Sequence, residues 1–417
     1  MKNNPLFFET AAIVLFAVMV FAAFAEEHTV VWTGDVKNLD AIPSIAGAEY
    51  SLLYYADGVT EEHFGAYSHH PHIIYHEGRL YATWSNHLQD EDCPGQRILM
   101  RQSTDLGKTW QPPLSEPPAI LFPSLDDWKK FGDTKTKDNR VGTSNGFAVV
   151  GGQLFAINEV LPNRQIDGFG RLARHINNDG TLGDLFWLEP TRPSTPAGYP
   201  EYPDLSDPKF KDVGAKINTF LADKERRNLL TWDFKGKRNT STELEPGNAG
   251  SPPDDHRLCE PTTSYRTPEG RLVVLWRDLG GRDRNAIPRS GRLYLSFSDD
   301  GGEHWSIPAP SAIPNCSSRP SAGNLPDGRC FVMTNPVSRQ HLVLSLSTNG
   351  RAFDEHFLVK KVDGETERMR FQGRAKGNGA AAYQHYCFAG DYCFVIYSVN
   401  KEDVEVVRFP LRSLDRL

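Results

Sequence analysis

The stretch STDLGKTW at residues 103–110 recurs with the same spacing as SDDGGEHW at residues 298–305. Both copies have the form Ser-x-Asp-x-Gly-x-x-Trp, and each follows an alternating apolar run that is typical of a β-strand. In such a turn the Asp can accept backbone N–H groups, the Gly can adopt a positive φ, and the Trp can pack beneath the sheet. The repeat therefore predicts a structural turn after equivalent strands and not a catalytic motif. Degenerate copies of it lie at 177–187 and 347–353.

A second pattern surrounds these structural turns: a β-rich run, a turn that usually contains Gly, and another β-rich run. Such segments predict β-hairpins, and their spacing is typical of four-stranded propeller blades. We therefore expect an all-β fold, a six-bladed β-propeller of antiparallel blades, with seven blades as the alternative. Little helix is expected, because no sustained helical periodicity appears. The hairpins fall at residues 72–85, 146–160, 219–234, 262–278, 322–336 and 385–399.

The remaining segments supply the edges of this fold. The strand at 28–34 is expected to close the ring against the last blade. Long irregular loops at 123–141, 192–216 and 235–258 are expected to overhang one face and to shape a central pocket.

The first 25 residues have the form of a secretory signal peptide, with Lys2 before a long apolar run that ends in small residues. An uncleaved anchor is the alternative. The propeller domain is then expected to occupy residues 26–417, and the protein to be secreted or periplasmic. The net charge of −7 argues against a nucleic-acid binder, which would carry a basic stripe.

The cysteines give no metal signature. Six cysteines in an exported chain permit disulfides, and Cys387 and Cys393 flank a turn across which they could pair. No Cys-x-x-Cys motif or Cys/His cluster indicates zinc, and no motif supports a structural calcium ion. We therefore expect no cofactor.

The Ser-x-Asp-x-Gly-x-x-Trp spacing is that of the Asp-box, and the chain resembles the sialidase-like β-propellers with Asp-box (BNR) repeats. Within this resemblance, the segment CEPTTSYRTPEGRLVVLWRD at 259–278 matches one that carries a Glu-Pro and then an Arg. The match implies that Glu260 tunes the nucleophile and that Arg277 is one arm of an arginine triad. A planar guanidinium suits this task because it can clamp a carboxylate with two hydrogen bonds.

Two later segments resemble the rest of that site. TNPVSRQHLVLSLSTNG at 334–350 implies a further triad arginine at Arg339, with Arg319 as the alternative. AAAYQHYCFAG at 380–390 implies a tyrosine nucleophile at Tyr383, with Tyr386 as the rival. A phenol with a pKa near 10 needs a carboxylate base to become nucleophilic, so pairing Tyr383 with Glu260 makes chemical sense.

The family's acid/base aspartate lies just before the first Asp-box. Here the segment contains Asp90, Glu91 and Asp92, of which Asp92 is the best match. Three adjacent acids also suit a solvated loop.

The first blade departs from the family pattern. Sialidases open it with Arg-Ile-Pro, and that arginine contacts the substrate carboxylate, whereas this chain has His69 in the arginine's place. His70, His72 and His87 add three imidazoles nearby, and a histidine cluster suits proton abstraction near neutral pH. Strand alternation predicts that His70 and His72 share one face and that His69 lies on the other. A metal site among them is the alternative, but no carboxylate ligand spacing supports it strongly, and none is predicted.

Three functions follow from the resemblance and its departure. The first is an exo-α-sialidase-like glycoside hydrolase that removes a terminal acidic sugar, with Tyr383, Glu260, Asp92 and the arginines in the site. The second is a lyase or rhamnosidase on rhamnosyl-glucuronate glycans, in which the histidines and a tyrosine act. The third is a non-catalytic glycan-binding propeller. In each case we expect a monomer whose partner is an acidic oligosaccharide or polysaccharide, with no nucleic acid and no membrane contact after signal cleavage.

Overall fold

The computed structural model of the protein is built almost entirely of β-strands. The segment proposed as a signal peptide lies outside the residues it describes, which are 30–58, 65–127, 140–162, 170–189, 198–222, 256–281, 283, 285–286, 288–364, 367, 369–371 and 380–415.

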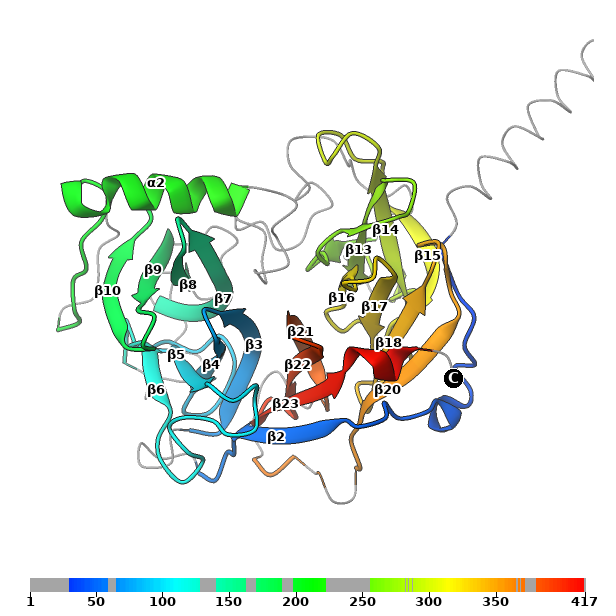
Figure 1. Ribbon diagram of the computed structural model, residues 1–417, viewed down its shortest axis with the longest axis horizontal. Coiled ribbons are helices and arrows are strands. Elements are labelled where there is room, and N and C mark those ends of the chain that lie inside the picture. The colour runs from blue at the N-terminus through cyan, green and yellow to red at the C-terminus, as the bar shows by residue number, and fades with distance from the viewer. Residues whose placement is uncertain are drawn as a thin grey trace, which may run out of the picture.

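Five antiparallel sheets follow one another along the chain and surround a common centre (Figure 1). The first contains β3 (Tyr67–His76), β4 (Arg79–His87), β5 (Arg97–Ser103) and β6 (Ala119–Phe122), and the second β7 (Arg140–Val150), β8 (Gln153–Pro162), β9 (Gly170–Ile176) and β10 (Leu182–Trp187). The third contains β11 (Leu258–Cys259), β12 (Tyr265–Arg266), β13 (Leu272–Asp278), β14 (Arg292–Ser298) and β15 (Ala309–Pro314). The fourth contains β16 (Ser321–Asn324), β17 (Cys330–Thr334), β18 (His341–Ser347) and β20 (Glu355–Lys361), and the fifth β21 (Ala382–Ala389), β22 (Tyr392–Val399), β23 (Asp403–Pro410) and β2 (Glu49–Tyr54).

This architecture confirms the all-β propeller of four-stranded blades. The inner strands of the five blades are β3, β7, β11 with β12, β16 and β21. Five of the six predicted hairpins are present, with positive φ at Gly78, Gly152, Gly270, Gly328 and Gly390 in their turns. The described residues hold five blades, so the expected number of six is not confirmed.

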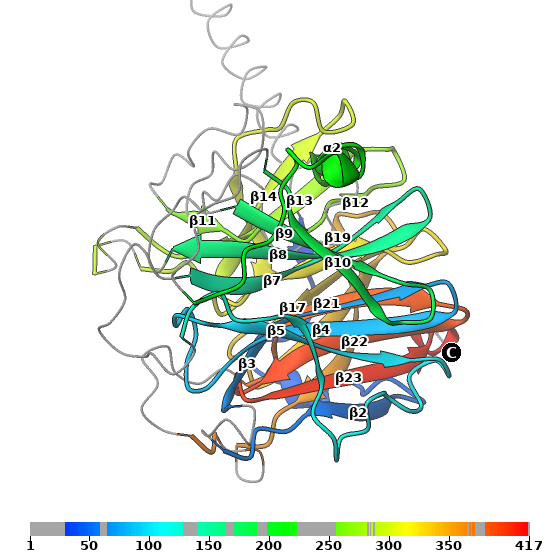
Figure 2. The same ribbon diagram turned by 90° about the vertical axis from the view of Figure 1, so that its left-hand side faces the viewer.

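The prediction of a hairpin at 219–234 was wrong over its first residues, and so was that of an irregular loop over the end of 192–216. Both overlap the helix α2 (Pro208–Ala222), while the rest of the proposed hairpin lies outside the described residues. Pro208 begins the helix, a position where its missing N–H costs nothing. Its apolar face packs on the second blade (Figures 1 and 2) and comprises Phe210, Gly214, Ile217, Phe220 and Leu221.

The predicted closing strand was also wrong. The strand β1 (Val31–Trp32) pairs in parallel with β15 and with β19 (Ala352–Phe353), so it joins the outer edges of the third and fourth blades. The last blade is completed instead by β2, which pairs with β23. The ring is therefore closed by a strand near the N-terminus, as expected, but that strand is residues 49–54 and not residues 28–34. Two short 3-10 helices, η1 (Leu39–Ala41) and η5 (Leu411–Leu414), lie at the ends of the domain sequence.

The core lies between successive blades. One cluster joins the first blade to the second, another joins the fifth to the first, and two more join the third to the fourth and the fourth to the fifth. All six cysteines are free thiols, and Cys330, Cys387 and Cys393 belong to this packing. Cys387 faces Phe394 across the hairpin and Cys393 faces Phe388, so the proposed disulfide between them is absent.

The two intact Asp-boxes form the predicted turns. In the first, the Gly107 N–H donates to Ser103 Oγ at 2.9 Å, and the Thr109 N–H donates to Asp105 Oδ1 at 2.9 Å. The second repeats these two hydrogen bonds with Ser298 and Asp300 as acceptors. Trp110 and Trp305 are both buried beneath their turns. These turns therefore serve the fold.

Replacement of Trp110 by Ala tests this assignment. Trp110 packs with Leu53, Trp84 and Phe394 between the fifth and first blades. Removing so large a buried side chain should lower the free energy of unfolding by about 3–5 kcal/mol, measured by urea denaturation. The folded fraction should keep its activity. A fully stable but inactive variant would contradict the structural role.

No helix among the described residues has the length and apolar character needed to cross a bilayer.

Candidate functional site

The candidate site residues lie where the inner strands depart from regular pairing. The β3–β4 pairing shifts register between His69 and His72, and the β21–β22 pairing shifts between Ala382 and His385. Non-glycine residues at these shifts have positive φ, 52° at His70 and 60° at Tyr383. Glu260, in the break between β11 and β12, has φ of 48°. Such backbone costs about 1–3 kcal/mol per residue and clusters at functional sites.

Tyr383, Glu260 and Arg277 form one hydrogen-bonded group. The Tyr383 hydroxyl donates to Glu260 Oε1 at 2.7 Å, and Arg277 Nη1 donates to Tyr383 Oη at 2.7 Å. Arg277 Nη1 also lies 2.5 Å from Glu260 Oε2. Tyr383 and Glu260 come from different blades and are 5% and 9% exposed. The sequence-predicted pairing of these two residues is therefore present in the fold.

The electrostatics of this group keep the carboxylate charged and the phenol neutral. Burial works to raise the pKa of Glu260, but the Arg277 guanidinium and the Tyr383 hydroxyl together lower that pKa below its usual value. Burial raises the pKa of Tyr383, against the opposing effect of Arg277. The resting pair thus consists of a phenol and an adjacent carboxylate base.

The lowered pKa of Glu260 predicts a pH-dependent contribution to stability. A lowered folded-state pKa stabilises the protein above the unfolded-state pKa of about 4.3, and this stabilisation is lost as pH falls through the folded-state value. Glu260→Gln should therefore cost about 3–5 kcal/mol near pH 7, and the difference from wild type should shrink below about pH 4. Urea denaturation at several pH values measures both. A difference that is independent of pH would contradict an ionised Glu260.

Arg319 and Arg339 lie beside the same tyrosine. The Arg339 guanidinium carbon is 5.6 Å from the centroid of the Tyr383 ring. Arg319 is 4% exposed, and the charges of Glu260 and Tyr383 act on it. Its Nε and Nη1 atoms are buried without a hydrogen-bond partner. All three sequence-predicted arginines thus converge on Tyr383, so Arg319 and Arg339 are not alternatives.

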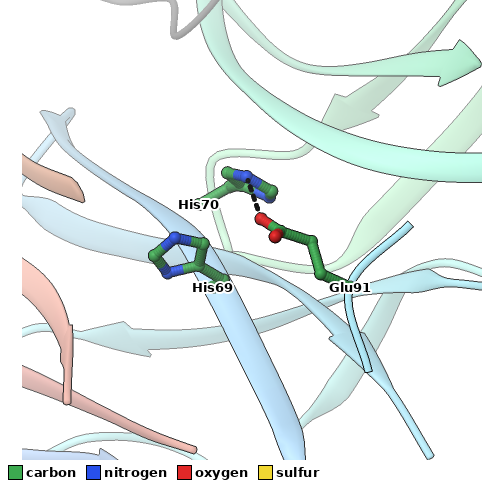
Figure 3. A group of neighbouring side chains, drawn as sticks. All are labelled: His69, His70 and Glu91. Atoms are coloured by element: carbon green, nitrogen blue, oxygen red, sulfur yellow. Dashed lines mark ion pairs between the residues drawn. The ribbon is translucent and has the colours of Figure 1, made fainter. Parts of the chain in front are cut away.

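His69 and His70 meet Tyr383 from the first blade. Their ring centroids lie 4.1 Å and 5.3 Å from that of Tyr383, and 4.7 Å from each other. The expected separation of His69 from His70 by strand alternation was wrong, because the register shift in β3 turns both rings to the same place (Figure 3). His72 instead contacts Ser144 and His385.

The loop that carries Asp90, Glu91 and Asp92, called here the acidic loop, contacts the two histidines through Glu91. His70 Nε2 lies 3.3 Å from Glu91 Oε1 (Figure 3). Lys401 Nζ lies 2.7 Å from Glu91 Oε2. The sequence-predicted residue, Asp92, has positive φ, and its backbone N–H donates to Gln96 Oε1 at 3.1 Å. Its charge still acts on His70. Sequence reasoning missed Glu91 and Lys401, since no motif marks which of three adjacent acids turns inward.

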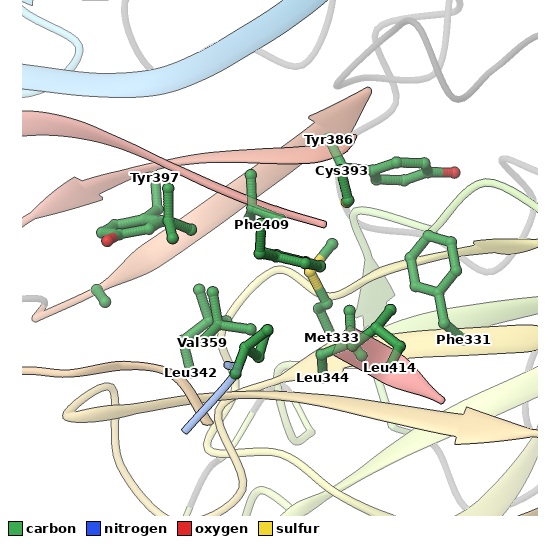
Figure 4. Close-up of a cluster of buried hydrophobic side chains, with 14 of the residues drawn as sticks. Phe331, Met333, Leu342, Leu344, Val359, Tyr386, Cys393, Tyr397, Phe409 and Leu414 are labelled. Atoms are coloured by element: carbon green, nitrogen blue, oxygen red, sulfur yellow. The ribbon is translucent and has the colours of Figure 1, made fainter. Parts of the chain in front are cut away.

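His87 and Tyr386 occupy structural positions. His87 Nδ1 accepts the backbone N–H groups of Gln89 and Asp90 and so organises the start of the acidic loop. Tyr386 lies in the core between the fourth and fifth blades (Figure 4) and donates its hydroxyl proton to Ala322 O at 3.1 Å.

Away from this group, a depression on the third blade is lined in part by Arg271, Phe297 and Asp299. Arg271 and Asp299 form a two-bonded ion pair there. Because these charges satisfy each other, whereas Arg319 lacks hydrogen-bond partners, the group around Tyr383 is the stronger candidate site.

Comparison with known families and structures agrees with this architecture. Residues 220–393 match a family model described as a BNR repeat-like domain, and residues 56–233 match one described as an N-terminal beta propeller. No curated protein matches the chain. A solved structure named Sialidase superposes with a TM-score of 0.67 at 23% identity, over 92% of this chain and 35% of that one. A Trypanosoma rangeli sialidase superposes with a TM-score of 0.47 at 14% identity, over 88% of this chain and 60% of that one.

This chain spans only 35% of the length of the first of these sialidases, so the likeness bears on the fold alone. Each family model matches less than half of the chain, and the two lie in successive parts of the propeller. The chain is therefore a β-propeller whose fold is similar to that of the sialidase, with a match to the BNR repeat-like domain over residues 220–393.

Proposed function

We propose that the protein is a glycoside hydrolase that removes a terminal acidic sugar from a glycan. The observation that carries the proposal is the Tyr383–Glu260 hydrogen bond beside three arginines, of which Arg319 is buried without a hydrogen-bond partner. A buried unpaired cation is costly, and an anionic ligand would offset that cost. The signal-like residues 1–25 support action outside the cytoplasm.

In this mechanism Tyr383 Oη attacks the anomeric carbon while Glu260 accepts its proton. The bond from that carbon to the leaving oxygen breaks, and a carboxylic acid of the loop at residues 90–92 delivers a proton to that oxygen. Water then attacks the same carbon and gives a proton to that carboxylate, the bond to Tyr383 breaks, and Glu260 returns its proton to the phenolate. Arg277 stabilises the phenolate as it leaves, and Arg319 and Arg339 hold the sugar carboxylate.

Elimination from a uronide is the second candidate, and it is favoured by one observation. His69 Nε2 is buried with no hydrogen-bond partner, next to Tyr383. Burial and the nearby Lys401 lower the pKa of His69 well below its usual value, so the ring is neutral near pH 7. A neutral imidazole with a free nitrogen could take the C5 proton of a uronic acid.

Purified protein incubated with a panel of acidic glycans separates these functions. Hydrolysis gives a product that has gained the mass of water. Elimination gives no such gain and produces the absorbance of an unsaturated uronide. The hydrolase proposal predicts the first result. Elimination products alone would favour the second candidate, and binding without any product would favour a glycan-binding propeller.

The substrate should differ from ordinary sialosides, because His69 stands where the resemblance puts a carboxylate-binding arginine. Losing one desolvated charged contact costs about 2–5 kcal/mol, which is roughly thirty-fold to several thousand-fold in kcat/KM. A different sugar acid, such as a uronic acid, should therefore react faster than a simple sialoside in matched assays. Fast sialoside cleavage that is unaffected by His69→Ala would contradict this.

A further inference from the structure

The group formed by His69, His70 and Glu91 is an unassigned feature beside Tyr383. Each of these residues offers a nitrogen or oxygen atom, and the three atoms lie within 4.8 Å of one another (Figure 3). All three side chains are buried, with residue exposures of 0%, 2% and 7%. Two imidazoles and one carboxylate form a common ligand set for a catalytic zinc ion.

The hydrogen bonds around His69 determine its tautomer. Ser398 Oγ donates its proton to Ala382 O at 3.3 Å, so it accepts the N–H of His69 Nδ1 at 2.6 Å. The proton is therefore on Nδ1, and Nε2 carries a bare lone pair. That Nε2 is buried and has no hydrogen-bond partner. A histidine held by an Nδ1–H bond, with a bare Nε2, is typical of a metal ligand.

Glu91 is oriented in a similar way. Its Oε2 accepts a hydrogen bond from Lys401 Nζ at 2.7 Å, while Oε1 lies 3.3 Å from His70 Nε2. Zinc bonds to nitrogen and oxygen are about 2.0–2.1 Å long, which puts neighbouring tetrahedral ligands about 3.3 Å apart. The pair thus has the spacing of two ligands on one ion.

The surrounding charges permit a cation. Asp90 and Asp92 flank Glu91 in the sequence, and the charges of all three acids act on the buried Tyr67. Lys401 and Arg339 oppose them, and the charges of both act on His69. Three carboxylates of the loop therefore lie near the site to offset the charge of a bound dication.

We propose that His69, His70 and Glu91 bind one transition-metal dication such as Zn²⁺ and leave a fourth position open toward Tyr383. The absence of a sequence signature follows from the fold, because the carboxylate reaches the histidines across the β3–β4 hairpin and its loop. In a consequence that rests on the proposed function, the open position on the ion could accept an oxygen atom of the acidic sugar.

Metal titration tests the site without reference to turnover. Full-length protein is stripped with a chelator, dialysed, and titrated with Zn²⁺ by calorimetry and with Co²⁺ by visible absorption. We expect one ion per chain and the intense visible bands of tetrahedral Co²⁺. His70→Asn and Glu91→Gln should each weaken binding by at least about 100-fold, and Ser398→Ala by about 10–100-fold.

Two further variants separate this site from adventitious binding and from a structural role. His304 is exposed and pairs with Asp300 at the second Asp-box, so His304→Asn removes a surface site and should leave the affinity unchanged. Lys401→Met removes the donor that orients Glu91, so like Ser398→Ala it should weaken binding by about 10–100-fold. Folded wild-type protein that takes up no stoichiometric ion would overturn the proposal, as would equal affinity in wild type, His70→Asn and Glu91→Gln. Either result would leave the hydrolase proposal standing.

Discussion

Tyr383→Phe should abolish turnover while leaving the fold intact. The change removes only the hydroxyl that donates to Glu260 and accepts from Arg277, and the ring stays between His69 and Arg339. Loss of a nucleophile that acts together with its base should lower kcat on the acidic glycan by about 10³-fold or more.

Tyr386→Phe is the matched control for this variant. It removes a hydroxyl that donates to Ala322 O in the core, so it should lower stability slightly and leave kcat near the wild-type value. Steady-state kinetics and urea denaturation of both variants measure the outcome. Equal kcat values for wild type and Tyr383→Phe would exclude Tyr383 as the nucleophile.

Arg319→Met should weaken catalysis and preserve or raise stability. Arg319 is a buried guanidinium whose Nε and Nη1 lack hydrogen-bond partners. Replacing a poorly paired buried charge by an apolar side chain of similar length is often neutral or stabilises by about 1–4 kcal/mol. If Arg319 holds the substrate carboxylate, the variant should lose about 2–5 kcal/mol of transition-state binding. That loss corresponds to a decrease in kcat/KM of roughly thirty-fold to several thousand-fold.

The opposite signs of these two effects make the experiment informative. Arg271→Met serves as the control, because Arg271 is paired with Asp299 at the depression on the third blade and should not affect kcat/KM. An Arg319→Met protein that is less stable and fully active would assign Arg319 to the fold.

A change of Arg277 to Lys should also weaken substrate binding more than charge alone predicts, because an ammonium cannot replace the planar fork.

The parts of the fold that depend on local chemistry could be predicted from the sequence. The Ser103–Trp110 turn and the glycine hairpins contain their own hydrogen-bond acceptors and turn residues. The parts set by long-range pairing could not. β2 pairs with β23 across almost the whole chain, and no local pattern distinguishes it from the strand at 28–34. The helix α2 was missed because most of its residues were assigned to the irregular loop at 192–216, and its end, residues 219–222, to a hairpin.

The candidate site shows the same division. Glu260, Arg277 and Tyr383 were predicted because each lies in a segment that resembles a family motif. The predicted orientation of the histidine side chains was wrong. Alternation of side chains along a strand assumes regular pairing, whereas the β3–β4 pairing shifts register between His69 and His72. Glu91 was missed because the direction of a loop carboxylate depends on backbone angles, such as the positive φ of Asp92, that the sequence does not display.

Covalent trapping tests the central claim most directly. Wild-type protein would be incubated with an activated, fluorine-substituted analogue of the sugar acid that the glycan panel identifies, then digested and mapped by mass spectrometry. The proposed mechanism predicts one added sugar per chain on the peptide that contains Tyr383, and none in Tyr383→Phe. A label on another residue, or continued turnover of the analogue with no covalent adduct at any time, would contradict the assignment of Tyr383 as the nucleophile.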